Sequence, residues 1–151
     1  MDSTKIENFS REHPGFEFPQ FTSVTPDDCA QVRSSIAGRL GLKAQSEPLE
    51  LLETLQARAK YFSGVNAEQE FDLLGLTSEL GFMPHADVLV NWHRFDQIDR
   101  LALSDFSEYF DDIWYPGSDD IEVFDESVDW LVLVRHDGVV SAVSLCRPDR
   151  C

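Results

Sequence analysis

The spacing of apolar residues predicts three helices in the first half of the chain. The first, over 25–41, opens with the capping residue Thr25, repeats apolar residues at every fourth position and ends at Gly41. The second begins near Ser46 and ends at Gly64, with one apolar face made of Leu52, Leu55, Ala59 and Phe62. The third opens at Asn66, where Asn66-Ala67-Glu68-Gln69 has the pattern of a capping box.

The period changes to two at Ala86, which predicts that strands dominate the rest of the chain. Apolar residues alternate with other residues in a first strand that contains Val88, Val90 and Trp92. A helix capped by Ser104 follows, with an apolar stripe of Phe106, Tyr109, Phe110 and Ile113. After a turn at Pro116-Gly117, a second strand contains Ile121 and Val123.

The segment from Val128 to Leu145 is typical of a β-hairpin. Two apolar runs flank Asp137-Gly138, a dipeptide that favours a two-residue turn. That turn would pair Val132 with Val143 and Trp130 with Leu145. The prediction is therefore an α+β fold, in which N-terminal helices pack on a C-terminal antiparallel sheet of about four strands with one interposed helix.

The first 23 residues contain four phenylalanines among Pro14, Gly15 and Pro19, and we interpret them as an irregular arm whose rings dock on the fold. The alternative is a segment that becomes ordered only on a partner. The length of 151 residues fits a single domain, 1–151, with an arm over 1–23, a mainly helical part over 24–81 and mainly strands over 86–146.

Composition and charge narrow the possible functions. Hydrophobic residues make up 42% of the chain, enough for a core, and 28 Asp and Glu against 12 Lys and Arg give a formal charge of −16. Such a charge repels phosphates, which argues against nucleic-acid binding, and no apolar run reaches the ~20 residues of a membrane span. The N-terminus has no signal-peptide pattern and the three cysteines form no C-x-x-C pair, so we expect a cytoplasmic protein.

The acids are concentrated between Arg100 and Arg135. This window holds ten acids and no Lys or Arg, interleaved with aromatic residues that include Trp114 and Tyr115. Aromatic residues beside charges are typical of protein interfaces, although a solvated acidic face and a Trp114 packed under the sheet are the plainer alternatives. The predicted partner-binding residues are Asp111, Asp112, Tyr115, Asp119, Asp120, Glu122, Asp125 and Glu126.

The chain carries little sign of catalysis or of metal binding. Asp119-Asp120-x-Glu122 lacks the glycine and the spacing of a calcium loop, and the four histidines have no cysteine or acid at zinc-ligand spacing. Local contexts for a nucleophile or for phosphate binding are also missing. The expectation is a protein that is not an enzyme and needs no metal or cofactor.

The run from Tyr109 to Asp120, Tyr-Phe-Asp-Asp-Ile-Trp-Tyr-Pro-Gly-Ser-Asp-Asp, and the hairpin after it resemble the C-terminal half of small bacterial immunity-type proteins. These proteins accompany toxin domains, including those of contact-dependent growth-inhibition systems. The resemblance covers residues 86–145 and concerns composition and layout. It implies a cytoplasmic inhibitor of one cognate toxin, and the acidic surface favours a basic, nuclease-type toxin. The alternatives are an adaptor for another basic protein and an enzyme that uses the acidic cluster.

Overall fold

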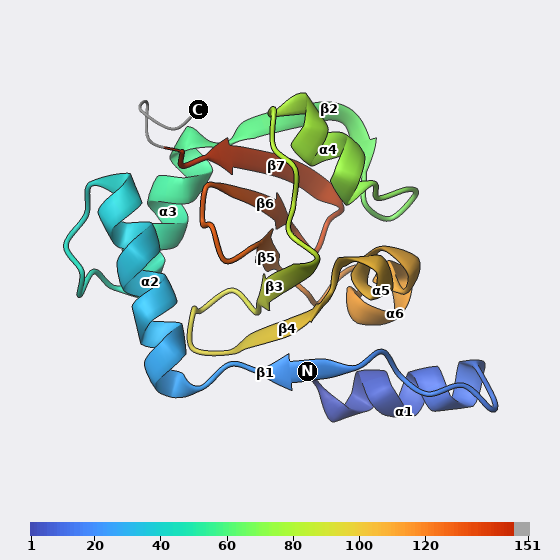
Figure 1. Cartoon of the computed structure of the whole chain (residues 1–151). Coiled ribbons are helices and arrows are strands. Elements are labelled where there is room, and N and C mark those ends of the chain that lie inside the picture. Colours follow the sequence, from blue (N-terminus) through green and yellow to red (C-terminus); the bar gives the residue numbers. More distant parts are fainter. Residues whose placement is uncertain (147–151) are drawn as a thin grey trace.

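A seven-stranded antiparallel sheet runs through the structure, a computed structural model that describes residues 1–146 (Figure 1). Its strands are β1 (Phe21–Ser23), β2 (Lys60–Asn66), β3 (Asp87–Asn91), β4 (Ile98–Ala102), β5 (Ile121–Phe124), β6 (Trp130–Val134) and β7 (Val139–Ser144). They lie in the order β1-β4-β3-β5-β6-β7-β2. β1 and β2 are therefore the two edges, and β5 lies at the centre.

Helices cover both faces of this sheet (Figure 1). They are α1 (Ser3–Glu12), α2 (Pro26–Leu40), α3 (Pro48–Arg58), α4 (Leu73–Glu79), α5 (Leu103–Glu108) and α6 (Phe110–Ile113). None of the helices within residues 1–146 has the length and apolar character needed to cross a membrane.

Two hydrophobic cores form because successive side chains of a strand point to opposite faces. Val88, Val123 and Trp130 face a core shared with α4, α5 and α6. Leu89 and Leu131 face a second core shared with α2 and α3. The expected packing of N-terminal helices on the sheet is thus confirmed for α2 and α3, whereas α4, α5 and α6 cover the opposite face.

Several local predictions are confirmed by the structure. The hydroxyl of Thr25 accepts a hydrogen bond from the backbone N–H of Asp28 at 3.2 Å and caps α2, and Gly41 ends this helix in the left-handed region at φ 75°. The strands that alternation predicts around Val88, around Val123 and on both sides of the hairpin are β3, β5, β6 and β7.

The predicted number of about four strands is wrong, because three strands carry little apolar signal. β1 has three residues at an edge, and β2 has an irregular burial pattern with a register shift between Tyr61 and Asn66. β4 contains Asp99 and Arg100 in a row, yet Asp99 is completely buried. The indole N–H of Trp92 (2.8 Å) and the hydroxyl of Ser23 (2.7 Å) donate to its carboxylate.

Three helix predictions are also corrected. The one interposed helix, expected to be capped by Ser104, is two short helices, α5 and α6, because the backbone of Tyr109 leaves the helical conformation, and Ser104 lies inside α5. The second helix ends at Arg58 instead of Gly64, and the chain continues directly into β2, whose pairing with β7 overrides the helical spacing. The third helix begins at Leu73, with Asp72 as its cap, so the part over 24–81 contains a strand among its helices. The Asn66 side chain accepts instead from the backbone N–H of Glu68 at 2.9 Å and shapes a turn.

The N-terminal arm is regular over much of its length, contrary to the prediction. Residues 3–12 form α1 and residues 21–23 form β1, which pairs with β4. The expected docking of the phenyl rings is confirmed for Phe9, which is 1% exposed, and for the partly buried Phe18 and Phe21, whereas Phe16 is 70% exposed. The helix forms because burial of Phe9 supplies stability that a ten-residue helix lacks in isolation.

The hairpin exists as predicted, but its register differs by one residue. Trp130 lies opposite Ser144, and Val132 lies opposite Ala142. Arg135 pairs with Val139 across a three-residue loop in which Gly138 adopts φ 79°. This loop places one more residue between the strands than a two-residue turn does, which accounts for the shift.

Candidate partner-binding surface

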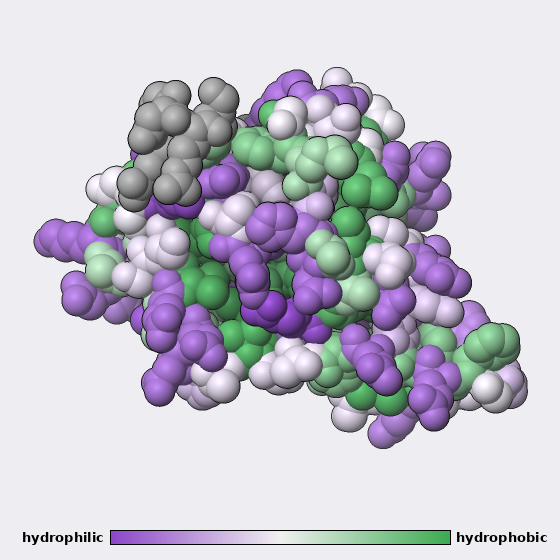
Figure 2. Space-filling model, in the orientation of Figure 1, coloured by the Kyte–Doolittle hydropathy of each residue, from purple (hydrophilic) through white to green (hydrophobic). Residues whose placement is uncertain are grey.

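The acid-rich window runs from two helices on one face of the sheet, through the central strand, to the turn beyond that strand. It begins in α5 and α6, passes through a loop to the central strand β5, and ends in the turn before β6. The surface in the orientation of Figure 1 shows hydrophobic residues in scattered groups between hydrophilic ones (Figure 2). Only some of the ten acids are accessible to a partner. By their surroundings they form three groups, which are described in turn: buried acids, acids in ion pairs, and acids without an ion pair in the described residues.

Two of the predicted binding residues, Glu122 and Asp125, are buried. Glu122 is 2% exposed and Asp125 is 1% exposed. The carboxylate of Asp125 accepts hydrogen bonds from the backbone N–H of His85 (3.0 Å), the backbone N–H of Ser127 (2.9 Å) and the indole of Trp130 (3.1 Å). Satisfied in this way, Asp125 holds the turn between β5 and β6 and presents nothing to a partner.

Glu122 belongs to a polar network at one end of the central strands. β3 places Asn91 directly opposite Glu122, and the Asn91 amide donates to its carboxylate at 2.5 Å. His93 Nδ1 lies 3.1 Å from the other carboxylate oxygen. Burial raises the pKa of Glu122, and the hydrogen bonds of His93 and Asn91 oppose this only in part. The hydrogen bond to Glu122 in turn raises the pKa of His93.

Five further acids pair with bases that other segments contribute. The pairs are Lys5–Asp119, His13–Asp112, Arg39–Asp129, Arg100–Glu126 and His136–Asp120. Four of the five acids are partly buried and Glu126 is exposed, while the exposure of the bases ranges from the buried Lys5 to the exposed His136. Bases from other segments thus neutralise five acids of a window that contains no base. The local sequence does not reveal these pairs, because the partners are far apart along the chain.

In one of these pairs, Asp120 contacts both the backbone and the side chain of His136. Its carboxylate accepts from the backbone N–H of His136 at 2.8 Å and lies 2.9 Å from the imidazole Nδ1 of the same residue. Burial acts to raise the pKa of Asp120, but these two hydrogen bonds and the charges of His136 and His93 together outweigh it and lower the pKa. The pair joins the start of β5 to the loop between β6 and β7.

Tyr115 and Asp119 form a pocket for an N-terminal lysine. Lys5 is 4% exposed, and its ammonium group contacts Asp119 and lies 3.8 Å from the centre of the Tyr115 ring. The ring of Trp92 lies on the same ammonium at 5.3 Å. Tyr115, predicted as a surface anchor, is therefore half-buried and contacts α1, while Trp114 is buried in the core.

Three acids of the window lack such partners within residues 1–146. Asp111 and Glu108 are exposed, Asp105 is half-buried, and no ion pair joins any of them to a base in this part of the chain. Asp105 and Glu108 lie on α5, and Asp111 lies on α6. Of these three acids, only Asp111 is among the predicted binding residues, because the sequence alone does not distinguish acids that form ion pairs from acids that do not.

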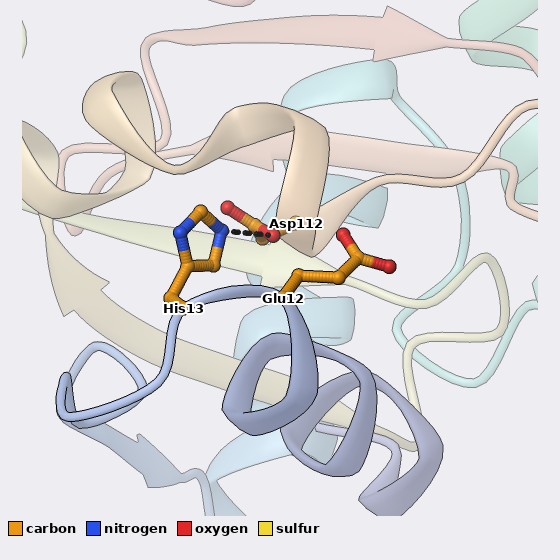
Figure 3. A group of neighbouring side chains, drawn as sticks. All are labelled: Glu12, His13 and Asp112. Atoms are coloured by element: carbon orange, nitrogen blue, oxygen red, sulfur yellow. Dashed lines mark hydrogen bonds and ion pairs between the residues drawn. The ribbon is translucent and has the colours of Figure 1, made fainter.

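Glu12, His13 and Asp112 bring three possible metal ligands together where α1 meets α6 (Figure 3). Their ligand atoms lie within 4.8 Å of one another. The imidazole Nε2 of His13 already lies at hydrogen-bonding distance, 3.1 Å, from Asp112, and Glu12 is exposed. The contact between His13 and Asp112 links the end of α1 to α6.

No protein-family model, curated protein or solved structure matches this chain.

Proposed function

We propose that this protein is a cytoplasmic immunity-type inhibitor, which binds and neutralises a basic bacterial toxin of the nuclease type without catalysis of its own. The observation that carries the proposal is a group of three acids on α5 and α6, Asp105, Glu108 and Asp111, which form no ion pair within residues 1–146 of a chain whose charge is −16. Mutual repulsion makes such a group unfavourable in the free protein, and a basic partner relieves it.

The neighbouring helix enlarges this surface. α1 packs against α6 and adds the exposed acids Glu7 and Glu12, with Arg11 as an exposed base. A nuclease holds phosphates in a basic cleft, so an acidic surface is steered towards that cleft and can occlude it. The contact surface we propose is centred on these three acids of α5 and α6, and Asp112, Asp119 and Asp120 lie around it as paired, partly buried groups.

A regulatory adaptor that binds another basic protein would use the same surface. The two functions differ in whether binding abolishes the activity of the partner. The second candidate function is an enzyme, and one observation supports it: the buried Glu122 lies beside His93. A carboxylate and an imidazole whose pKa values are shifted are typical of a general base. The variant Glu122→Gln separates an inhibitor from an enzyme. If the chain protects cells by binding alone, a folded Glu122→Gln variant still protects them, whereas protection that needs Glu122 as a general base is lost.

The test uses the product of the neighbouring reading frame as the partner. Growth of cells that express this product is compared with and without the chain, and the rate of association is measured over a salt series. We expect protection from growth arrest, and an association rate that falls steeply as salt shortens the Debye length from about 10 Å at 0.1 M to about 3 Å at 1 M. If the chain neither protects the cells nor binds this product, the proposal is overturned.

A matched pair of variants locates the surface. In the first, Asp105→Asn, Glu108→Gln and Asp111→Asn remove three charges from α5 and α6. In the second, Asp27→Asn, Glu50→Gln and Glu53→Gln remove three exposed charges from α2 and α3 on the opposite face. We expect the first to slow association about tenfold or more at low salt and the second to change it little. Equal rates in both variants would refute this location.

A further inference from the structure

A groove lies beside α5, between the N-terminal segment and the outer strands of the sheet. Its volume is about 590 Å³, within the range of ligand-binding pockets. Its apolar lining comes from α1, β1, β4 and the segment before β1, namely from Ile6, Phe18, Phe21 and Leu101. Two carboxylates, Asp87 at the start of β3 and Asp105 on α5, also line the groove.

The charge of this groove is not neutralised by the part of the chain that the structure describes. Asp87 is exposed, Asp105 is half-buried, and neither forms an ion pair within residues 1–146. Arg100 also lines the groove, but its guanidinium pairs with Glu126, a residue of the adjoining hollow. The groove therefore combines apolar walls with two available negative charges.

We propose that this groove receives an arginine side chain of the basic protein partner. The three-carbon stem of arginine is apolar and suits walls of Ile6 and Leu101, while the guanidinium pairs with a carboxylate through two parallel hydrogen bonds. Phe18 and Phe21 lie edge to face, with ring centres 6.1 Å apart, so their rings offer surfaces on which a planar guanidinium stacks. Lysine lacks both the fork and the plane, which favours arginine.

This inference rests on the proposed function, because the partner it names is the same basic protein. A second groove, of about 330 Å³, lies between β2 and α4 and contains Glu70, Asp72 and Glu79. The Asp72 carboxylate is already used there, since it accepts from the backbone N–H of Gly75 at 3.0 Å and caps α4. That groove supplies a matched control, because Glu70→Gln removes one exposed carboxylate from a comparable hollow.

The experiment titrates the ¹⁵N-labelled protein with the peptide acetyl-Ala-Arg-Ala-amide and follows the backbone amide resonances. We expect the largest shifts at residues 18–22 and 101–105. The same peptide with citrulline in place of arginine has nearly the same shape without the charge, and it should bind at least about tenfold more weakly. Shifts spread evenly over all acidic segments, or equal binding of both peptides, would overturn the inference.

Substitutions test the two carboxylates separately. Asp87→Asn and Asp105→Asn should each weaken binding of the arginine peptide about tenfold, whereas Glu70→Gln should leave it unchanged. Equal affinity in Asp87→Asn, Asp105→Asn and Glu70→Gln would refute the arginine site. The amide spectrum of each variant reports whether it is folded.

The outcomes also separate this inference from the proposed function. If the neighbouring gene product binds Asp87→Asn and Asp105→Asn as tightly as the unmodified chain, the arginine site fails and the inhibitor function stands. If the arginine peptide binds in the groove and the gene product binds nowhere, the groove stands as a site for arginine and the inhibitor function fails.

Discussion

Removing the charge of Asp119 should destabilise the fold even though the chain carries a large excess of acids. The Lys5 ammonium contacts this carboxylate, and the two side chains are only 5% and 16% exposed. Asp119→Asn leaves the lysine charge in a site where little water reaches it. Breaking a buried ion pair by removing one partner costs about 3–5 kcal/mol, and the residual exposure of Asp119 lowers our expectation to about 2–4 kcal/mol.

The amide of the variant can still accept the hydrogen bond that the backbone N–H of Tyr115 donates to Asp119 at 2.8 Å. The loss therefore reports mainly on the charge. For a chain of this size, about 2–4 kcal/mol corresponds to a drop in Tm of about 5–15 °C. The free energy of unfolding from urea denaturation, with calorimetry for Tm, measures both quantities.

Two further variants isolate the pair. Lys5→Met keeps an apolar side chain against the ring of Tyr115 and removes the charge, so it should cost less than Asp119→Asn. The double variant should cost at least about 1 kcal/mol less than the sum of the single variants, because the two residues act together. Glu108→Gln, at an exposed acid without an ion pair in the described residues, should change stability by at most about 0.5 kcal/mol. If Asp119→Asn is as mild as Glu108→Gln, the buried pair does not stabilise the fold.

Three other predictions follow from the core and the titratable groups. Trp130 is 1% exposed in a packed core, so Trp130→Ala should cost about 3–5 kcal/mol in urea denaturation, and a loss under about 1 kcal/mol would contradict its burial. The pKa values of His93 and Glu122 are both raised, so the native state binds protons more tightly there, and the free energy of unfolding should fall as pH rises from about 5 to 8. Glu122→Gln should flatten this slope, and an identical slope would refute the assignment. Neither a chelator nor added zinc should change the Tm of the unmodified chain or of His13→Gln. A rise in Tm with zinc that His13→Gln abolishes would show that the cluster at Asp112 binds metal.

Features that depend on neighbouring residues could be predicted from the sequence. The cap, length and exit of α2 depend on interactions within one helix, so Thr25 and Gly41 identify both ends. Alternation identified β3, β5, β6 and β7 because each of these strands buries apolar side chains. Within the hairpin, one extra loop residue shifts the register and places Val143 on the opposite face from Val132. Local propensity does not decide between the two loop lengths, so it does not decide the register either.

The candidate site depended on contacts between distant segments. Asp119 meets Lys5 across 114 positions, Asp112 meets His13 across 99, and Asp129 meets Arg39 across 90. The sequence determined that ten acids lie in one window without a base, and the tertiary structure decided which of them, on α5 and α6, have no ion pair among the described residues. Electrostatic pairing acts through space over a few ångströms, so the availability of a charge is a property of the folded chain, while the number of charges is a property of its sequence.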